Sequence, residues 1–189
     1  MINVKTKSGF RNLGRKHLHA SILMAASPHN LVNRVSLLLS LTDIFNMHSQ
    51  VKKEKLSIIA FSGTVDKLYP VAILASGAAA MGMDVEIFLT FWGLNAFRKD
   101  QLNQPGRISR DFEEMAPVMM NIFKVKNVPH WIDMLKQAKE FGNVKIYACA
   151  MTYDLFQMKK EELSELIDGV VGVGEFLEKA KESNITLFI

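Results

Sequence analysis

Residues 56–91 read LSIIAFSGTVDKLYPVAILASGAAAMGMDVEIFLTF, and this stretch decides the fold. Its first part, 56–61, is an apolar run that favours a strand, and the helical stretch after the Ser-Gly-Thr turn ends at Gly82. A second run, 85–91, is apolar almost without a break, which is typical of a strand buried on both faces of a parallel sheet. Strand, helix and strand in this order predict a right-handed crossover unit.

The same alternation continues to the end of the chain. Further strands are predicted at 144–148, 169–173 and 185–189, and further helices at 131–141, 159–167 and 175–181. A short turn of polar and apolar residues is expected directly after the third strand. Residues 51–189 are therefore expected to form one α/β domain, a three-layer sandwich around a five-stranded, mainly parallel sheet with flavodoxin-like layering.

Residues 93–128 form the irregular part of the domain. Apolar residues recur there at the i, i+3, i+4, i+7, i+8 spacing of one helix face, namely Met115, Val118, Met119, Ile122 and Phe123. Methionine-rich faces suit adaptable contacts, so this helix could be a lid or an oligomer contact. The alternative is that the stripe belongs to the ordinary core.

Charge separates the first fifty residues from the rest of the chain. Residues 1–50 carry six Lys or Arg and one acidic residue, whereas the remainder carries 17 basic and 18 acidic residues. The predicted domain is thus nearly neutral, and it lacks the basic face with interleaved aromatic residues that is typical of a nucleic-acid-binding domain. We therefore expect no nucleic-acid partner.

Three interpretations of residues 1–50 remain open. Residues 31–45 place apolar side chains on one face of an amphipathic helix, which could touch a partner or a membrane surface. The segment could instead be a loosely ordered basic extension, or translation could start at Met47. Its apolar stretches are too short for a membrane span, and no convincing signal-peptide cleavage site follows them.

The inventory of cysteine and histidine limits the chemistry. The chain has one cysteine and five histidines, and only His130 of these histidines lies in the predicted domain. A single cysteine forms no internal disulfide, so a reducing cytoplasm is the expected compartment. No metal-ligand spacing is present, and neither is a GxxxxGK[ST] motif nor a GxGxxG motif after a strand. We predict no metal and no cofactor.

The cysteine, Cys149, lies in the stretch KIYACAMTYDLFQM, residues 145–158, just beyond the predicted third strand. Ligands of open α/β sheets collect at the carboxyl ends of the strands, so the thiol is expected to face a crevice. Thr152 and Asp154 are candidate N-caps for the following segment, and a helix N-terminus beside a thiol lowers its pKa. The Asp154 carboxylate would oppose this effect if it came close to the sulfur. The alternative is an inert buried cysteine.

Three stretches carry a resemblance to a known family: SGTVDKLYPVAILASGAAAMGMDVEIFLTFWGLNAF (62–97), VKIYACAMTYDLFQMKKEEL (144–163) and GVGEFLEKAKESNITLFI (172–189). They resemble the DsrE/DsrF-like proteins, in particular the DsrE branch often labelled peroxiredoxin family. The resemblance extends over nearly all of residues 55–189 and does not include the first fifty. It implies a small three-layer α/β sandwich, which agrees with the pattern of strands and helices.

In that family, a cysteine after a central strand accepts sulfur as a persulfide or thiosulfonate and passes it to a partner, often a small TusA-like carrier. The resemblance gives Cys149 this role and implies a sulfur carrier or sulfurtransferase that works without a cofactor. It also implies inorganic or protein-bound sulfane sulfur as cargo, another thiol protein as acceptor, and a homo-oligomer. Ala150, Tyr153 and residues 98–128 depart from the family's usual residues, which leaves the partner open.

The predicted substrate-binding set lies around the carboxyl ends of the strands and comprises Ser62, Gly63, Thr64, Asp66, Trp92, Thr152 and Asp154. The Ser-Gly-Thr turn could offer N–H groups and a hydroxyl to an anionic sulfur chain, or it could simply cap a helix. Trp92 could wall the pocket or belong to the core. Asp66 could orient the loop or cap the helix.

Two other functions stay open at this point. One is a non-catalytic, oligomeric module that binds a small ligand in the same crevice or responds to it. The other is peroxide reduction, which needs a resolving thiol that this chain lacks.

Overall fold

The structure is a computed structural model that describes residues 53–102, 104 and 106–189. Residues 1–50, with the helix predicted at 31–45, lie outside the described residues. The strands are β1 Lys55–Ala60, β2 Asp84–Leu89, β3 Val144–Cys149, β4 Gly169–Val171 and β5 Ile185–Phe188. The α-helices are α2 Val65–Ala80, α3 Phe91–Ala96, α4 Ala116–Val125, α5 Trp131–Phe141, α6 Ala150–Leu155 and α7 Val173–Ala180. Two 3-10 helices complete the described elements, η1 Arg110–Met115 and η2 Lys160–Glu162.

The five strands form one parallel sheet with the order β4-β3-β2-β1-β5. Strands β1 to β4 follow one another across the sheet, and β5 returns to the free side of β1. The register pairs Ala60 with Leu89 and Leu89 with Ala148, so β1, β2 and β3 reach the carboxyl edge of the sheet together. The predicted α/β fold with a five-stranded parallel sheet is confirmed.

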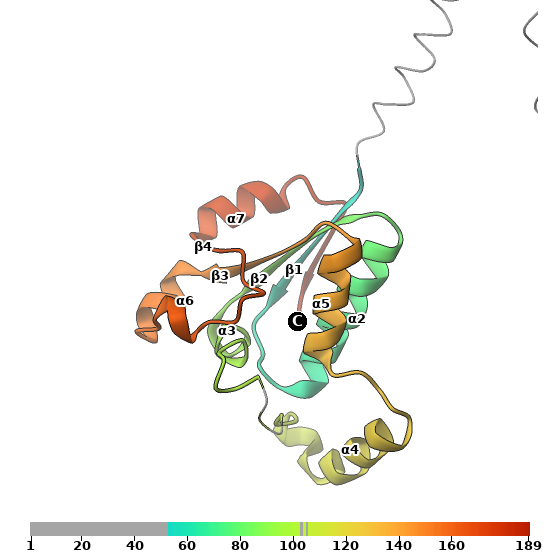
Figure 1. The fold of residues 1–189 in the computed structure, drawn as a ribbon. Coiled ribbons are helices and arrows are strands. Elements are labelled where there is room, and N and C mark those ends of the chain that lie inside the picture. Colours follow the sequence, from blue (N-terminus) through green and yellow to red (C-terminus); the bar gives the residue numbers. More distant parts are fainter. Residues whose placement is uncertain (1–52, 103, 105) are drawn as a thin grey trace, which may run out of the picture. The chain divides into compact units, whose positions relative to one another are not determined.

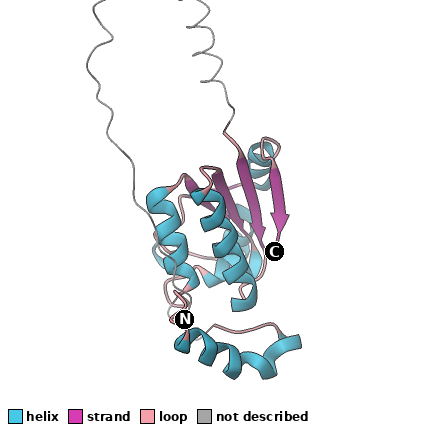
Figure 2. Cartoon of the chain, turned by 90° about the vertical axis from the view of Figure 1, so that its right-hand side faces the viewer, coloured by secondary structure: helices cyan, strands magenta, loops and turns pink. Residues whose placement is uncertain are grey.

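Helices cover both faces of the sheet. Figure 1 shows α2 and α5 on one side and α7 on the other, and Figure 2 shows α2 and α5 side by side in front of the strands. The main core lies between the sheet and α2/α5, where Ile58, Ile87 and Ile146 of the three central strands are fully buried. The α7 side holds a smaller cluster around the stacked rings of Phe88 and Phe176, whose centroids are 4.5 Å apart. The α7 layer therefore contributes less buried apolar surface than the α2/α5 layer.

The helix predicted at 159–167 is wrong. Only the 3-10 turn of η2 forms there, and the chain then bends toward β4. Tertiary contacts explain the difference, because Ser164 N–H donates to Phe97 O at 2.9 Å and Lys99 N–H donates to Glu162 O at 2.8 Å. These bonds draw the segment into antiparallel contact with the end of α3, which a continuous helix could not provide.

The turn predicted after the third strand is also wrong, because α6 begins there. Cys149 belongs to β3 and is the N-cap of α6, so neither Thr152 nor Asp154 caps this helix. A second short helix, α3, follows β2 directly where the sequence pattern indicated no element. Both helices are only six residues long, and a periodic pattern needs more residues to become visible.

The apolar stripe on α4 divides between the core and the surface. Met119 and Phe123 pack against the main core, and the Phe123 ring lies 4.6 Å from the Tyr69 ring. Met115, Val118 and Ile122 are each at least half exposed. The core interpretation therefore holds for the first two residues only.

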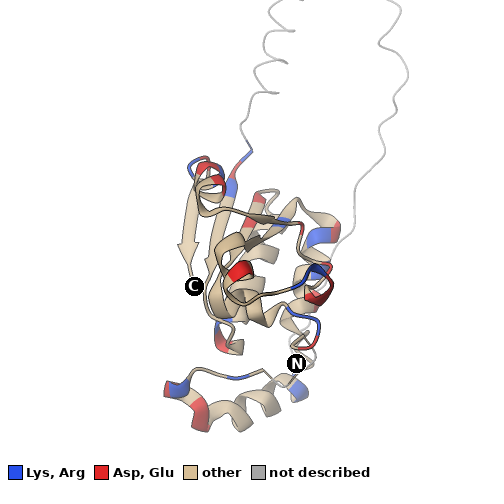
Figure 3. Ribbon diagram, turned by 90° about the vertical axis from the view of Figure 1, so that its left-hand side faces the viewer, with Lys and Arg blue, Asp and Glu red and all other residues tan. Residues whose placement is uncertain are grey.

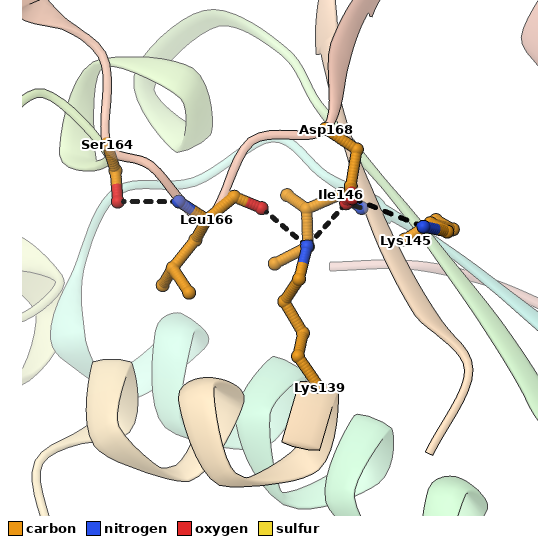
Figure 4. Close-up of polar contacts among 6 residues, drawn as sticks. All are labelled: Lys139, Lys145, Ile146, Ser164, Leu166 and Asp168. Atoms are coloured by element: carbon orange, nitrogen blue, oxygen red, sulfur yellow. Dashed lines mark hydrogen bonds and ion pairs between the residues drawn. The ribbon is translucent and has the colours of Figure 1, made fainter. Parts of the chain in front are cut away.

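Asp168, the residue directly before β4, links this strand to α5 and β3 through its carboxylate (Figure 4). Its carboxylate accepts from Lys139 Nζ at 2.5 Å and from the Ile146 N–H at 2.8 Å, and Lys145 Nζ lies 3.4 Å away. Lys139 Nζ also donates to Leu166 O at 2.8 Å. Burial raises the pKa of Asp168, but the Lys139 ammonium and the Ile146 N–H outweigh it and hold the pKa below its ordinary value.

In the ribbon of Figure 3, positions of basic and of acidic residues both occur on several of the described elements. No helix among residues 53–102, 104 and 106–189 is both long and apolar enough to cross a membrane.

Asp168→Asn is expected to lower the free energy of unfolding by about 1.5–3 kcal/mol, because Lys139 keeps a mostly buried ammonium and loses its counter-charge. Urea unfolding followed by circular dichroism at neutral pH measures this loss. Since the pKa of Asp168 is lowered in the folded state, its contribution is present at neutral pH and declines as the pH falls through the folded pKa. The difference in the free energy of unfolding between the wild type and Asp168→Asn should therefore become smaller in acid.

The matched control is Asp133→Asn, which breaks an exposed pair with Lys136 and should cost less than about 0.5 kcal/mol. Equal losses in the two variants would contradict the role of Asp168.

Candidate functional site

Cys149 lies on the α7 side of the sheet. Side chains alternate across a strand, so Ala148 packs into the α2/α5 core while Cys149 joins the cluster of Phe88, Val171 and Phe176. Only 6% of Cys149 is exposed. The prediction that the thiol faces an open crevice is therefore wrong for the described chain, because side chains of the neighbouring strand β4 and of α7, Val171 and Phe176, surround it.

The surroundings of Cys149 still favour its ionised form. Burial raises the pKa of the thiol, but the backbone N–H and hydroxyl of Thr152, the hydroxyl of Thr90 and the N–H of Met151 together bring it below the ordinary pKa of cysteine. Cys149 is the N-cap of α6 by position, and its side chain makes no capping hydrogen bond with the first turn of this helix. These donors are therefore placed to stabilise the negative charge of a thiolate. Asp154 is exposed and is not among the groups that shift this pKa.

Thr152 joins α6 to the end of β2. Thr152 is only 1% exposed. Its hydroxyl oxygen, Oγ1, lies 3.1 Å from Thr90 Oγ1 and accepts a hydrogen bond from the Phe91 N–H at 3.1 Å. Phe91 has a φ of 46°, a left-handed conformation that costs a bulky residue about 1–3 kcal/mol. The hydrogen bond to Thr152 helps to hold this strained residue. The beginnings of α3 and α6 are thus tied together beside the sulfur of Cys149.

A cavity of about 650 Å³ lies at the carboxyl ends of β1 and β2. Its walls include four of the predicted substrate-binding residues, namely Ser62, Gly63, Thr64 and Trp92. Leu68 and Trp131, which also line it, belong to the core on the sheet face opposite Cys149. The predicted residues therefore separate. Ser62, Gly63, Thr64 and Trp92 form the cavity group, and Cys149 and Thr152 form a second group that lines no part of the cavity. Asp66 and Asp154 belong to neither group.

Two backbone N–H groups at and directly after the Ser62–Thr64 turn are engaged in hydrogen bonds. Ser62 Oγ accepts from the Thr64 N–H at 3.3 Å, and the Val65 N–H donates to Arg107 O at 2.7 Å. Thr64 is the N-cap of α2 by position, without a side-chain capping bond. Packing favours glycine at position 63, because a Cβ there would lie 2.4 Å from the carbonyl oxygen of Trp92. The turn therefore brings α2 and α3 together.

Asp66 ties the first turn of α2 to the segment before η1. Its carboxylate accepts from the Ser109 N–H at 2.9 Å and from the Ser109 hydroxyl at 2.5 Å. Burial raises the pKa of Asp66, but the hydroxyls of Ser109 and Thr64 and the Ser109 N–H leave it lowered. These contacts favour the loop-orienting interpretation of Asp66 over the helix-cap interpretation.

Trp92 is not a core residue. It is 57% exposed, and its ring lies 5.4 Å from the ring of Phe156 at the end of α6. Because Trp92 also lines the cavity, it stands between the cavity and α6.

A family model described as the DsrE/DsrF/DrsH-like family matches residues 52–120 and 107–188. The chain belongs to this family. It is 37% identical over 163 residues to the sulfur carrier protein DsrE2 of Allochromatium vinosum, a match that covers 74% of this chain and 100% of that protein. It is 36% identical over 164 residues to the uncharacterized protein YrkE of Bacillus subtilis, covering 76% of this chain and 100% of YrkE.

A solved structure supports the fold of this DsrE/DsrF/DrsH-like chain. The ychN protein of E. coli superposes with a TM-score of 0.50 over 72% of this chain and 99% of that protein, at 16% identity. At this identity the likeness shows the fold alone.

Several residues of the two groups were missed by sequence reasoning. Thr90 carried a signal, because it is a hydroxyl residue at the end of an apolar strand, one position beyond the Leu89–Ala148 pair. Phe91 and Arg107 carried none, because a left-handed backbone and a long-range hydrogen bond leave no mark on the residue type. Trp131 was expected only as a buried helix residue, yet it also forms a cavity wall.

Within the described part of the chain, no group of three His, Cys, Asp or Glu side chains could hold a metal ion.

Thr152→Val is expected to raise the pKa of Cys149, because it removes a hydroxyl that stabilises the thiolate. The pH dependence of alkylation by iodoacetamide measures this, since only the thiolate reacts, and the midpoint should move to higher pH. The variant should also lose about 1–3 kcal/mol of stability, because the Phe91 N–H loses its acceptor.

The control is Thr186→Val on the exposed edge strand β5, which should leave the midpoint unchanged. A midpoint that stays in place in Thr152→Val, or that moves to lower pH, would contradict the role of Thr152.

Proposed function

We propose that this DsrE/DsrF/DrsH-like protein carries sulfane sulfur on Cys149 and passes it to the thiol of a partner protein. The observation that carries the proposal is the position of the chain's single thiol, at the carboxyl end of the inner strand β3 and beside the donors of Thr90, Met151 and Thr152 that lower its pKa. The 37% identity to a protein named as a sulfur carrier supports the same role. A TusA-like carrier or another thiol protein is the proposed acceptor, within a cytoplasmic homo-oligomer.

The transfer is a pair of exchange reactions at divalent sulfur. The Cys149 thiolate attacks the outer sulfur of a donor persulfide or polysulfide, a bond forms between the two sulfurs, and the donor leaves as a thiolate. An acceptor thiolate then attacks the same outer sulfur, and Cys149 leaves as a thiolate. No external oxidant or reductant is needed. Thr90 and Thr152 serve both steps, because each step has negative charge on the sulfur of Cys149.

A route to the sulfur must open during the transfer, since Cys149 is 6% exposed. The α7 side is the easier side to open, because only Phe176 and Ala180 of the eight residues of α7 are buried. A shift of α7 would leave Thr90 and Thr152 beside the sulfur, because Thr90 directly follows β2 and Thr152 belongs to α6. Opening on this side therefore preserves the groups that favour the thiolate.

The small-ligand alternative required a crevice shared with the thiol, and the described cavity does not include Cys149. Peroxide reduction would require a resolving thiol from another molecule, since the sequence contains one cysteine. The sulfur carrier is therefore the function that the site supports best.

The carrier function is tested by incubating the purified protein with polysulfide and weighing it by intact mass spectrometry. We expect a mass increase of one or more sulfur atoms in the wild type and none in Cys149→Ser. Addition of a small thiol should then remove the added mass, because the acceptor takes the outer sulfur. An unmodified wild type whose thiol reacts with polysulfide only after unfolding would overturn the proposal, as would an equal adduct in Cys149→Ser.

The access route is tested by Phe176→Leu, which removes the ring that stacks on Phe88 and keeps an apolar side chain. We expect severalfold faster alkylation of Cys149 in the folded protein, at a cost of roughly 1 kcal/mol of stability. Leu177→Ala changes an exposed neighbour on α7 and should leave the rate as it is. An unchanged alkylation rate in Phe176→Leu would direct the search for the route to another side of Cys149.

A further inference from the structure

The cavity at the carboxyl ends of β1 and β2 has no part in the proposed sulfur transfer. Its lining residues belong to the Ser62–Thr64 turn, to α2, α3 and α5, and to positions 101, 102, 104, 106 and 107, and Cys149 is not among them. We propose that this cavity is a second binding site, which takes a small organic anion with a planar ring system. The site lies where open α/β sheets commonly hold ligands, at the carboxyl edge of the strands.

The charge of the cavity favours an anion. Among the described residues that line it, Arg107 is the only charged one, and none of them is acidic. Arg107 takes part in none of the ion pairs of the described residues. A guanidinium with no carboxylate partner is well suited to a carboxylate, sulfonate or phosphate group, which it can bind through two parallel hydrogen bonds.

Two backbone contacts fix the position of Arg107 at the cavity. Its carbonyl oxygen accepts from the Val65 N–H at 2.7 Å, and Ser109, two residues later, is held by both oxygens of Asp66. The main chain around Arg107 is therefore anchored to the first turn of α2. Anchoring of this kind reduces the entropy that the arginine loses when it binds an anion.

The walls of the cavity favour a planar ring. Trp92 and Trp131 are the only two tryptophans in the chain, and both line the cavity. Trp131 is buried and Trp92 is more than half exposed, so one indole belongs to the interior and the other to the rim. Leu68 and Leu102 add apolar surface. Indole rings stack well on flat aromatic groups.

The remaining walls and the size of the cavity exclude the smallest anions as a good fit. The carboxamides of Asn95, Gln101 and Gln104 can both donate and accept hydrogen bonds, so they suit polar substituents on a ring. A volume of about 650 Å³ falls within the range of pockets that hold small organic ligands. A simple oxyanion bound at Arg107 would leave the aromatic walls without contact.

The chain's two tryptophans make the site directly measurable. The full-length protein labelled with ¹⁵N has only two indole N–H signals, and both report on this cavity. The probes are 2-naphthoate and 2-naphthamide, which share one ring system and differ in charge. We expect 2-naphthoate to shift the indole signals saturably, with a Kd at least about tenfold lower than that of 2-naphthamide.

Arg107→Gln should bring the Kd of 2-naphthoate to within about twofold of that of 2-naphthamide, because only the charged contact is lost. The matched control is Arg110→Gln, a nearby exposed arginine that does not line the cavity, and it should leave both constants unchanged. Ala96→Leu fills the cavity from α3 and should weaken both probes. Backbone amide signals that stay in place away from the cavity show that each variant is folded.

Absence of saturable shifts for 2-naphthoate up to about 1 mM would overturn the proposal, as would equal affinities for the two probes. Unchanged binding in Arg107→Gln would remove its electrostatic basis. Cys149→Ser should bind 2-naphthoate like the wild type, and loss of binding in that variant would show that the cavity and the thiol form one site. Failure of sulfur loading at Cys149 would leave these binding results untouched.

Discussion

Both groups of site residues depend on one constraint, which is that the register of β1, β2 and β3 makes the three strands end at the same edge of the sheet. Pairing of Leu89 with Ala60 and with Ala148 brings the next residues of three strands to one edge of the sheet. On one flank this edge places Thr90 beside Cys149, where its hydroxyl favours the thiolate. On the other flank it places the Ser62–Thr64 turn beside α3, where the cavity forms. A slip of one residue in β2 would dismantle both groups, because every side chain of that strand would change face.

Strand alternation then decides which side of the sheet each residue serves. Ala148 belongs to the large core under α2 and α5, so Cys149 must face α7. The sequence allowed the prediction that the cysteine lies at the carboxyl edge, because an apolar strand leads directly into it. It did not allow the side to be predicted, because that depends on Cys149 still being paired in β3 with Val171. The expected single crevice was wrong for this reason.

The inner strands β1, β2 and β3 and the long helices could be predicted because their apolar runs are long or strongly periodic. The short helices α3 and α6 could not, and the charged stretch before β4 was mistaken for a helix. In each case tertiary bonds decide the structure: Thr152 holds Phe91 in a left-handed conformation, and Phe97 O draws the Ser164 N–H away from a helical partner. Arg107 reaches the cavity through a similar bond to Val65. Such long-range contacts leave no periodic signal in a sequence.

Burial and activation of the thiol act together in a sulfur carrier. An exposed thiolate is open to oxidation and to exchange with any passing disulfide, so a cover over Cys149 would protect the sulfur that we propose it carries. Burial under this cover raises the pKa of the thiol, and the donors from Thr90, Met151 and Thr152 more than offset this rise. These donors come from β2 and α6, whereas the cover includes Phe176 of α7. Because activation and cover come from different elements, the protein can open the second without losing the first.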